Sequence, residues 1–489
     1  MERTWRKRWA WMFAAILIAG TFGVWGAVAA PLPAEWQKTA DVVVVGAGGA
    51  GLSAAVSAAE KGATVIVIEK MPVVGGNTII SGGFINAADP KRQPKQNIQD
   101  SPQLHFEQTM AAGDFRADPE KVKILTHQAY DAVEWLESHG MKYRDEVFQV
   151  YGALYPRSHI PVEPKGTGYI KVLKAAADKA GVQIFTETRM TDIIREEKSG
   201  GRVLGVRAED SRGQPVYFQA KKAVVLATGG FGANKELRAL HDPRMRELTT
   251  TNHSGATGDG ILAAMDVGGY PIGMDYIQCN PGPPPGRKLR VTLHLDVSGF
   301  IMVDKRGKRF VAEDERRDVI RDAVLNTPEK YGFAVVDDAV FQTYDKITQN
   351  TTARGFETGD AWKAETLEEL AGKIGVPSED FVATVKQYNE YVEKAHDPDF
   401  GKNPRNLTKK IQTPPFYACF AGMSVHHTMG GLNINSKTQV LDRKGEVIPG
   451  LYAAGEVTGG IHGTNRVGGN ALMDIVVFGR IAGKNAAEE

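Results

Sequence analysis

The stretch ADVVVVGAGGAGLSAAVSAAEKGATVIVIEK, residues 40–70, contains the pattern of a strand, a glycine turn, a helix and a second strand. Val42 to Val45 form a continuous apolar run, which is typical of a strand buried on both faces of a parallel sheet. An alanine-rich segment follows, and the apolar run TVIVIEK after it leads to Glu69. This order of elements predicts a nucleotide-binding α/β fold of the Rossmann type.

Each residue of the glycine turn has a physical task in such a fold. Gly46, Gly48 and Gly51 form the spacing GxGxxG between the predicted strand and the predicted helix. The first glycine permits the tight turn, the second lets the backbone approach a pyrophosphate, and the third lets helix and strand pack closely. The helix N-terminus stabilises phosphate charge, and the Glu69 carboxylate can accept hydrogen bonds from ribose hydroxyls. The spacing alone is weak evidence, but in this context it is strong.

Glycine-rich segments farther along the chain favour FAD over NAD as the cofactor. The segment at residues 75–83 follows Glu69 closely, and two more segments, KAVVLATGGFG (222–232) and PGLYAAGEVTGG (449–460), each contain a predicted strand that runs into glycines. Turns from several separated strands suit a long cofactor such as FAD. The candidate cofactor ligands in these segments are Gly76, Asn77, Ser81, Gly82, Gly83, Thr228, Gly229 and Glu456.

The N-terminal segment has the composition of a signal peptide. Four basic residues within positions 3–8 are followed by an apolar run from Trp9 to Val28, and Ala27-Val28-Ala29 offers a cleavage site. We therefore expect residues 1–29 to be removed on export and the protein to be periplasmic. Because the apolar run is nearly long enough to span a bilayer, an uncleaved membrane anchor is the alternative.

Composition excludes several classes of protein. Removal of residues 1–29 takes away four basic and one acidic side chain and changes the net charge from +1 to −2, which gives no indication of nucleic acid as a partner. The chain has only two cysteines, Cys279 and Cys419, and no CxxCH motif, which excludes a covalently attached haem on this chain. The two cysteines could pair in an oxidising compartment or stay free and buried. We assign no metal site.

Four segments carry motifs that are specific to one family. They are GGNTIISGGFINAA (75–88), TTNHSGATGDGILAA (250–264), SVHHTMGGL (424–432) and GLYAAGEVTGGIHGTNRVGGNALMDIVVFGR (450–480). Together they resemble the flavin subunit of the fumarate reductase and succinate dehydrogenase family, over roughly residues 40–489. The chain is most similar to the branch of soluble periplasmic flavocytochrome c reductases, which includes fumarate, urocanate and acrylate-type reductases. The resemblance adds Asp259, Asn470 and Ala471 to the expected FAD ligands.

The resemblance also implies a split α/β architecture. A Rossmann-like FAD-binding domain would occupy residues 40–274 and resume at 428–489, with an α+β capping domain inserted at 275–427. The sequence supports an insertion, because IQCNPGPPPGRKLR is a proline-glycine break and the helical patterns LEELAGKIG and FVATVKQYNEYVEKA form a self-contained unit. In the family the substrate site lies where the capping domain meets the flavin.

Two adjacent histidines, His426 and His427, stand in the segment SVHHTMGGL. In isolation such a pair would indicate a surface loop, or a strand with one ring on each face. His426 and Arg466, however, match the histidine and arginine that bind the substrate carboxylate in the family. An arginine can hold a carboxylate through two hydrogen bonds, and an imidazole can donate another. We expect His427 to orient this site by packing or backbone bonding.

Arg317 matches the arginine that the family uses as a proton donor to the substrate. Because an arginine normally stays protonated, this role requires fast reprotonation or surroundings that make the neutral form accessible. Electrostatic stabilisation alone is a milder alternative. A third interpretation makes Arg316 and Arg317 ion-pair partners of acids on the same helix. We favour the catalytic role for Arg317 and the ion-pair role for Arg316.

The chain departs from the family pattern at the far end of the substrate pocket. Asn280 replaces a family histidine that binds a second carboxylate, and Leu293 replaces a glutamate after the retained Thr292. We expect these three residues to contact the substrate. The loss of the histidine and the glutamate removes the groups suited to a second carboxylate.

The same departures affect proton supply. The missing glutamate belongs to the family's proton relay, and the relay's arginine is Asp296 in this chain. The relay is therefore missing or rebuilt, with Asp296 or His294 as candidates. Arg287 or Arg290, from the preceding loop, could still enter the pocket.

These features predict a periplasmic, FAD-dependent reductase of an α,β-unsaturated monocarboxylate such as acrylate, methacrylate or a cinnamate-like acid. Fumarate reduction is the first alternative, with urocanate or a ketosteroid as more distant ones. A non-catalytic FAD electron carrier is an alternative of another class, although such a carrier needs no carboxylate-binding residues. We expect noncovalent FAD, because GGNTIISGG contains no histidine for attachment. The electron donor would be a separate c-type cytochrome.

Overall fold

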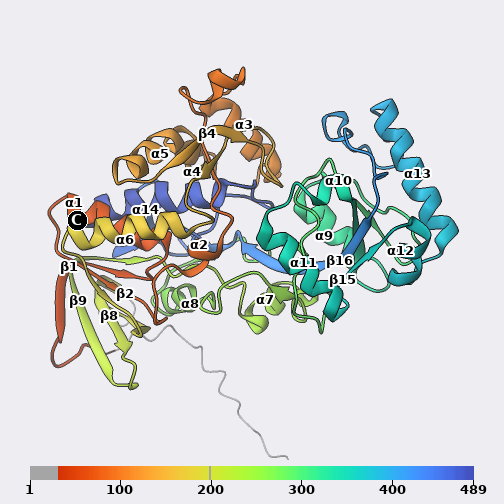
Figure 1. Ribbon diagram of the computed structural model, residues 1–489. Helices are drawn as coiled ribbons and strands as arrows, with labels where there is room; N and C mark the ends of the chain where they lie inside the picture. The colour runs from red at the N-terminus through yellow and green to blue at the C-terminus, as the bar shows by residue number, and fades with distance from the viewer. Residues whose placement is uncertain (1–30, 198–199) are drawn as a thin grey trace, which may run out of the picture.

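The computed structural model describes residues 31–197 and 200–489. The predicted signal peptide lies outside the described residues. Figure 1 shows two bodies side by side, with the N-terminal strands, the yellow helix α6 (Thr167–Lys179) and the C-terminal helix in one and the green-to-blue middle of the chain in the other. No helix in the described ranges is long and apolar enough to cross a membrane.

The first body is built on an eight-stranded sheet, in which a strand from the C-terminal part of the chain joins strands from the N-terminal part. The main path of the sheet runs β18 (Gln439–Leu441), β19 (Val447–Ala453), β9 (Pro215–Leu226), β1 (Lys38–Val45), β2 (Val65–Ile68) and β6 (Gln183–Phe185). All neighbours from β19 to β6 are parallel. The antiparallel strands β7 (Arg189–Glu197) and β8 (Gly200–Glu209) extend the sheet beside β9. This arrangement confirms the predicted split α/β fold.

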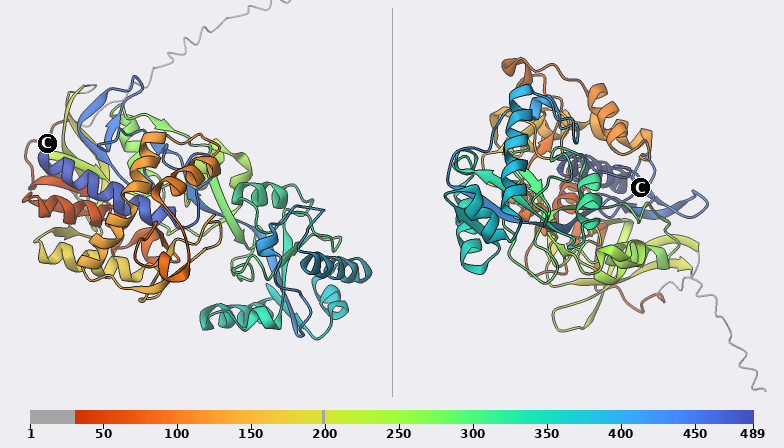
Figure 2. Two further views of the ribbon diagram at one scale, coloured as in Figure 1. Left: turned by 90° about the horizontal axis from the view of Figure 1, so that it is seen from above. Right: turned by 90° about the vertical axis from the view of Figure 1, so that its right-hand side faces the viewer.

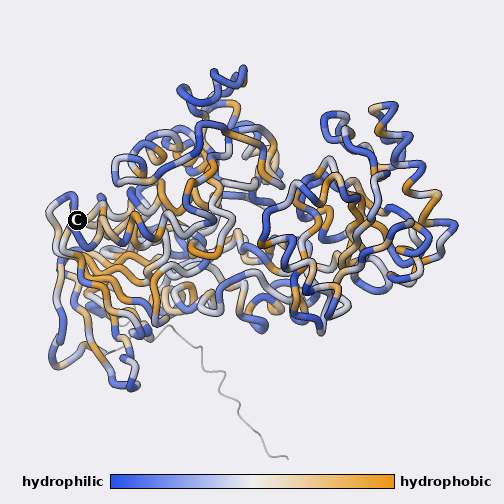
Figure 3. The backbone as a smooth tube through the Cα atoms, viewed as in Figure 1, coloured by the Kyte–Doolittle hydropathy of each residue, from blue (hydrophilic) through white to orange (hydrophobic). Residues whose placement is uncertain are grey.

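The centre of the first sheet is buried because its strands are apolar on both faces. In β1 and β2 the paired valines Val44 and Val67 are both fully buried, and Val44 also pairs with Val225 of β9. Figure 3 shows the strands of this sheet as the most continuous hydrophobic region of the molecule. A parallel sheet of this kind needs helices on its faces.

Two helices from opposite ends of the chain pack on each other over this sheet. They are α1 (Gly49–Glu60) and α14 (Asn470–Glu488), which lie side by side in both Figure 1 and the left view of Figure 2. A Cβ on Gly483 of α14 would lie 2.1 Å from the Ala54 carbonyl oxygen of α1. Glycine at this position therefore allows the two backbones to approach, and the approach fixes the start of α14 near the glycine turn.

The second body contains a mixed sheet and a core of its own. Its strands are β10 (Thr249–Thr250), β12 (Ile277–Gly282), β13 (Ile301–Val303), β14 (Gly332–Asp337), β15 (Ala361–Ala364) and β16 (Phe416–Thr428). Its main helices are α9 (Arg317–Leu325), α11 (Lys346–Thr358), α12 (Leu367–Ile374) and α13 (Ser378–Lys394). The predicted helical patterns after residue 366 are confirmed as α12 and α13. Phe333, Phe381 and Leu370 are among the buried side chains of its core.

The long strand β16 connects the two bodies. Its first half pairs with β14 and β15 in the second body, and its second half pairs with β10 and β12. His426 lies near the end of this strand, where the chain returns toward the first sheet. Because β10 precedes residue 275 and still joins this sheet, the predicted domain boundaries at 274/275 and 427/428 stay predictions.

A third, small sheet lies beside the first body. It consists of β3 (Ile85–Asn86), β5 (Ser158–Pro161) and β4 (Tyr143–Phe148), and helices α3 (Pro102–Ala112), α4 (Pro119–His127) and α5 (Ala129–Ser138) lie near it in Figure 1. The loop between β4 and β5 carries Tyr151 to the second body. Cys279 and Cys419 are both free and buried.

Candidate active site

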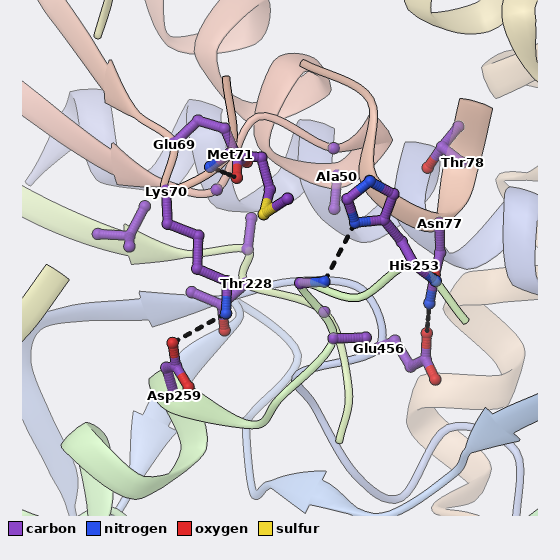
Figure 4. Close-up of a pocket in the computed structure, with 18 of the residues that line it drawn as sticks. Ala50, Glu69, Lys70, Met71, Asn77, Thr78, Thr228, His253, Asp259 and Glu456 are labelled. Carbon is purple, nitrogen blue, oxygen red and sulfur yellow. Dashed lines mark hydrogen bonds and ion pairs between the residues drawn. The ribbon is translucent and has the colours of Figure 1, made fainter. Parts of the chain in front are cut away.

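A cavity opens at the carboxyl ends of β1, β2 and β9. Its empty space, with the open solvent at its mouth included, is about 860 Å³, and concave sites of this kind hold small molecules and cofactors. Figure 4 shows side chains from separate segments facing this space, including Glu69 after β2, Thr228 after β9 and Glu456 after β19. Open α/β sheets bind their ligands at such an edge. We call this space the cofactor cavity.

The glycine turn presents backbone to the cofactor cavity. A Cβ on Gly46, whose φ is +104°, would lie 2.4 Å from the Ala227 carbonyl oxygen, and a Cβ on Gly51 would lie 1.8 Å from the Gly46 carbonyl oxygen. These two glycines are needed for the turn and for the packing of α1. A Cβ on Gly48 would meet no protein atom closer than 3.9 Å and would take space from the cavity. Gly76 and Gly229 also line the cavity.

Glu69 is held in place by backbone amides. Its Oε2 accepts a hydrogen bond from the Ala47 amide at 2.8 Å, and its Oε1 accepts one from the Met71 amide at 2.9 Å. An ionised carboxylate can accept about four hydrogen bonds, so both oxygens retain capacity toward hydroxyl groups in the cavity. The turn and the acid are thus fixed relative to each other before any ligand enters.

Asp259 lines the cofactor cavity and already has a cationic partner. Lys70 Nζ lies 2.9 Å from Asp259 Oδ2, and the Thr257 hydroxyl donates to Asp259 Oδ1 at 2.7 Å. Burial opposes ionisation of Asp259, but the bonds to Lys70 and Thr257 outweigh it and hold the pKa of this carboxyl below its ordinary value. Lys70 and His253 also line the cavity but were not among the predicted ligands, although Lys70 directly follows Glu69 and His253 lies in the motif at 250–264.

Asn77 and Glu456 meet in another part of the cavity wall, as Figure 4 shows. Asn77 Nδ2 donates to Glu456 Oε2 at 3.3 Å and to Asn252 Oδ1 at 2.6 Å. The Thr428 amide donates to Glu456 Oε1 at 2.9 Å. Burial raises the pKa of Glu456 despite these hydrogen bonds. Residues 77, 252, 428 and 456 therefore form one polar unit from four separate segments.

Some predicted cofactor ligands do not line this cavity. Ser81 caps the end of α2 (Gly76–Ile80), where its hydroxyl donates to the Thr78 carbonyl at 2.7 Å. The Asn470 side chain lies in a buried network, in which its Oδ1 accepts from Asn86 at 2.9 Å. The residues outside the lining are Gly51, Ser81, Gly82, Gly83, Asn470 and Ala471. Their contacts with FAD stay predictions.

A second group of residues gathers where the two bodies meet. Three arginines reach it from different segments, namely the loop after β12, the first position of α9 and the loop before α14. We call this group the arginine cluster. It consists of Arg290, Arg317, Arg466, Gln278, Tyr151, His294 and His426.

Gln278 is the central residue of the arginine cluster. Its Oε1 accepts from Arg317 Nη1 at 3.1 Å and from Arg466 Nη2 at 2.9 Å. Its Nε2 donates to Asn465 Oδ1 and to the Arg466 carbonyl, both at 2.9 Å. One buried amide thus positions two buried guanidinium groups. The Nε atoms of Arg317 and Arg466 are buried and have no hydrogen-bond partner among the described residues.

The arginine cluster carries excess positive charge in a buried place. Burial lowers the pKa of Arg466 to about 9, and the nearby Arg317 charge acts in the same direction. Burial lowers the pKa of Arg317 to about 10, again with a contribution from a neighbouring arginine, Arg290. Glu456 and Asp474 oppose the shift at Arg466. A bound carboxylate would neutralise part of this charge.

His426 belongs to this cluster as a neutral imidazole. Burial lowers its pKa far below 6.5, and the charges of Arg466 and Arg317 lower it further. Its Nδ1 lies 2.7 Å from the Thr251 hydroxyl. With the hydroxyl donating to Nδ1, the ring proton lies on Nε2, where it can donate to a carboxylate.

His427 has different surroundings from its neighbour. Its Nδ1 lies 3.5 Å from Glu456 Oε1, and its ring makes an edge contact with His462 at a centroid distance of 5.6 Å. Burial keeps the pKa of His427 far below 6.5, so this contact joins a neutral ring to Glu456. Alternation along β16 explains how two adjacent histidines reach different partners.

The three residues predicted to contact substrate differ in placement. Asn280 of β12 is 7% exposed, and its Oδ1 has no partner among the described residues. Thr292 is partly exposed, whereas Leu293 is fully buried in the apolar core and its carbonyl accepts from the Tyr344 hydroxyl at 2.9 Å. No cation is supplied at positions 280 and 293.

The two arginines of the loop after β12, Arg287 and Arg290, have different partners. Arg287 pairs with Asp360 at 2.8 Å and lies over the Phe420 ring at 4.8 Å. Arg290 donates to the Pro281 carbonyl at 3.1 Å, and its charge contributes to the lowered pKa of His426. Arg290 therefore reaches the arginine cluster, and Arg287 is held outside it.

Comparison with known proteins shows the family to which this chain is similar. The family model described as FAD binding domain matches residues 41–472. A fumarate reductase (cytochrome) of Shewanella frigidimarina is 40% identical over 94% of this chain and 79% of its own length. An NADH:acrylate oxidoreductase of Vibrio harveyi is 37% identical over 92% of this chain. The chain spans about half of that relative, 51% of its length.

A solved structure has the same fold. The open conformation of a flavocytochrome c3 fumarate reductase aligns with a TM-score of 0.77 and 36% identity, over 93% of this chain and 79% of the other. The cofactor cavity fits FAD, because the backbone at Gly48 is open to it and the fixed Glu69 carboxylate can accept from ribose. Glu69, Asn77, Thr228 and Glu456 are the predicted ligands whose polar side chains line this cavity, together with Asp259.

Proposed function

The chain belongs to the FAD binding domain family, among flavin-dependent reductases of fumarate and acrylate, and we propose that it reduces the C=C bond of an α,β-unsaturated carboxylate. The preferred substrates would be monocarboxylic acids such as acrylate, methacrylate or a cinnamate-like acid. The observation that carries this proposal is the joint binding of Arg317 and Arg466 by Gln278, beside a neutral His426. A buried group of this charge suits a carboxylate ligand.

The residues divide the work of the reaction. Arg466 and His426 bind the carboxylate, through a guanidinium and an Nε2 proton. Arg317 donates a proton to the α-carbon from a guanidinium whose pKa burial has lowered to about 10. When bound, reduced FAD supplies the hydride for the β-carbon. Charge that develops on the carboxylate and α-carbon is stabilised by fixed cations that need little reorganisation.

The preference for one carboxylate rests on residues 280 and 293. Asn280 is neutral, and Leu293 is packed in the apolar core. A carboxylate buried beside them without a cation would lose its hydration without compensation. An apolar substituent on the α- or β-carbon would meet no such penalty, so methacrylate and cinnamate-like acids are reasonable substrates.

Fumarate is the second candidate, because of Arg290. This arginine reaches the arginine cluster and is bonded only through its Nε to a carbonyl among the described residues. Its free guanidinium nitrogens can bind a second carboxylate at the far end of the pocket. Fumarate reduction would therefore depend on Arg290, whereas acrylate reduction would not.

Electrons must reach the flavin from outside this chain. We propose a separate c-type cytochrome as the donor and the periplasm as the location, since the Shewanella relative is named fumarate reductase (cytochrome) and this chain spans 79% of it. The alternative class, a non-catalytic electron carrier, does not explain the arginine cluster. A carrier needs no buried carboxylate site.

Anaerobic reoxidation of the reduced protein tests the proposal. The flavin is reduced with one equivalent of dithionite and mixed with acrylate, methacrylate, cinnamate or fumarate, and its absorbance is followed. At least one acid should reoxidise it within seconds, with the monocarboxylates ahead of fumarate in kcat/KM. Reoxidation by none of them identifies an electron carrier instead.

Two variants of the 283–300 loop separate the substrate candidates. Arg290→Leu should leave acrylate reduction nearly unchanged and remove any fumarate reduction. Arg287→Leu is the matched control, because it removes an arginine of the same loop that is paired with Asp360. If fumarate is the better substrate of the native protein and Arg290→Leu removes that preference, the dicarboxylate assignment replaces the monocarboxylate one.

We also propose that FAD is bound without a covalent link. The segment GGNTIISGG contains no histidine for attachment, and the Nδ1 of the cavity residue His253 accepts from the Gly255 amide at 3.1 Å. Acid precipitation should release all yellow colour into the supernatant as FAD. Flavin that stays with the precipitated polypeptide would contradict this assignment.

A further inference from the structure

Arg317 lies in surroundings that hold it firmly but supply no acid. Its Nη1 donates to Gln278 Oε1 at 3.1 Å and its Nη2 donates to the Tyr151 carbonyl at 2.6 Å. No carboxylate forms an ion pair with it in the described parts of the chain. If Arg317 gives a proton to substrate, as the proposed function requires, the proton must return from another kind of group.

Two side chains that can carry protons lie next to Arg317. The Tyr151 ring faces the guanidinium at 5.1 Å, measured from its carbon to the ring centroid. His294 makes an edge contact with Tyr151, with ring centroids 5.9 Å apart. Tyr151 comes from the loop between β4 and β5, and His294 comes from the loop between β12 and β13. The two bodies of the molecule thus contribute one group each.

Both groups have unused hydrogen-bonding capacity. Within residues 31–197 and 200–489, neither the Tyr151 hydroxyl nor the His294 ring has a hydrogen-bond partner. Tyr151 is partly exposed, whereas His294 is 4% exposed. A hydroxyl and a neutral imidazole each have a proton to give and a lone pair to receive one. They can therefore pass a proton without holding a charge.

The acidic side chains near Arg317 already form ion pairs with other cations. Asp296 pairs with Lys409 at 2.6 Å. Asp318 and Asp114 pair with Arg316, at 2.6 and 2.5 Å. Asp114 and Asp318 thus form ion pairs with Arg316 and not with Arg317.

We propose that Tyr151 and His294 return the proton to Arg317 after each turnover. In the reaction, one Arg317 N–H bond breaks, and its proton forms a C–H bond at the substrate α-carbon. The neutral guanidine that remains takes a proton from the Tyr151 hydroxyl, which regains one through His294 or from water. No electrons move in this return, and one proton from solvent is consumed per turnover.

The acidities of the groups suit this exchange. Burial lowers the pKa of Arg317 to about 10, and burial raises the pKa of Tyr151 above its ordinary value of 10.0. Both groups therefore carry their protons at neutral pH, and the lowered pKa of Arg317 brings its acidity closer to that of a phenol. Burial, with the charges of Arg290 and Arg317, lowers the pKa of His294 far below 6.5, so this ring is neutral and keeps one lone pair.

The test compares the first turnover with later ones. Reduced protein starts with Arg317 protonated, so one anaerobic reoxidation by the best enoate needs no returned proton. Tyr151→Phe and His294→Asn should keep this first rate within about twofold of the native rate. Their steady-state kcat, with a saturating artificial donor, should fall at least tenfold, and the solvent deuterium effect on kcat should rise.

Tyr344→Phe is the matched control. It removes a buried hydroxyl that bonds to the Leu293 carbonyl, beside His294 in the chain, without touching Arg317. It should change neither rate beyond about twofold. Flavin content and thermal unfolding confirm that each variant is folded, and His294→Gln replaces His294→Asn if the latter is not.

The outcomes separate this proton route from the proposed function. If native protein is reoxidised but both variants keep the native steady-state kcat, the route is wrong and the function stands. If a variant loses the first turnover as much as the later ones, its side chain shapes the substrate site and the route is again wrong. If no enoate reoxidises native protein, the proposed function fails and the route fails with it.

Discussion

The cofactor cavity and the arginine cluster are built differently. Backbone and side chains that follow neighbouring strands of one sheet line the cofactor cavity. The arginine cluster consists mainly of long charged side chains from both bodies. In the cavity, Glu69 is bonded to amides of the same βαβ unit. In the cluster, Gln278 joins Arg317 and Arg466, which are 149 positions apart in the sequence. A site made of backbone tolerates an absent ligand at little cost, but a buried group of cations is destabilised until an anion binds.

The comparison predicts that side-chain changes in the arginine cluster affect chemistry most. Arg317→Gln should lower kcat by about 10³-fold or more, because it removes a general acid from the transition state. Flavin content and the spectrum should not change. Arg316→Gln is the matched control, since Arg316 is bonded to Asp114 and Asp318 outside the cluster. Near-native kcat for Arg317→Gln would make this arginine a structural residue.

A smaller effect is expected from Arg466, because its contact exists before and during the reaction. Arg466→Ala should weaken binding of the unsaturated acid by about 10- to 100-fold, the range for a charged hydrogen bond. It should also lower kcat. Titration of flavin absorbance with substrate measures the binding change directly. An unchanged dissociation constant with a lower kcat would show that Arg466 acts only in the transition state.

In the cofactor cavity, a side chain added at a glycine should reduce FAD binding more than the removal of any charged group. Gly48→Leu should reduce bound FAD to below about one tenth of the native content, because the new side chain takes space that the cofactor needs. The protein should still fold, since no protein atom lies close to the added Cβ. Gly372→Ala, at an open position of α12, is the matched control and should retain FAD. Native flavin content in Gly48→Leu would place the pyrophosphate elsewhere.

The same contrast explains how much could be predicted from sequence. The glycine turn and Glu69 are encoded within 31 consecutive residues, and their geometry follows from a strand, a turn and a helix. The split sheet was predicted from the family motifs, and the parallel pairing of β19 with β9 agrees with it. Local sequence specifies the glycine turn, because β1, α1 and β2 are neighbours along the chain, whereas the pairing of β9 with β1 and β19 joins distant segments.

The arginine cluster could be predicted only in part. His426, Arg317 and Arg466 were found through motifs, but Gln278 and Tyr151 were not. Gln278 is a neutral residue in a short strand, and Tyr151 lies in an irregular loop without a periodic signal. Their roles arise from the meeting of two bodies, which no local pattern encodes. The choice between Arg287 and Arg290 likewise depended on Asp360, a partner 70 or more positions away.

The smallest expected effect is on stability, and it tests the charge of the arginine cluster in the native protein. An unsaturated acid at 100 times its dissociation constant adds about 2.7 kcal/mol to the stability of the folded state and should raise Tm by a few degrees. The corresponding amide, which has no charge, should not.

The pH dependence of this stabilisation follows from Arg466, whose pKa burial lowers to about 9 from an ordinary value of 12.5. Its destabilising charge is therefore fully present at neutral pH and is relieved as the pH rises through about 9. Because the acid binds the charged form, the ligand-induced rise in Tm should shrink between about pH 8 and pH 10, as measured by differential scanning fluorimetry. Arg287→Leu should give the same curve as the native protein, and an equal rise with acid and amide would mean that the cluster does not bind the carboxylate.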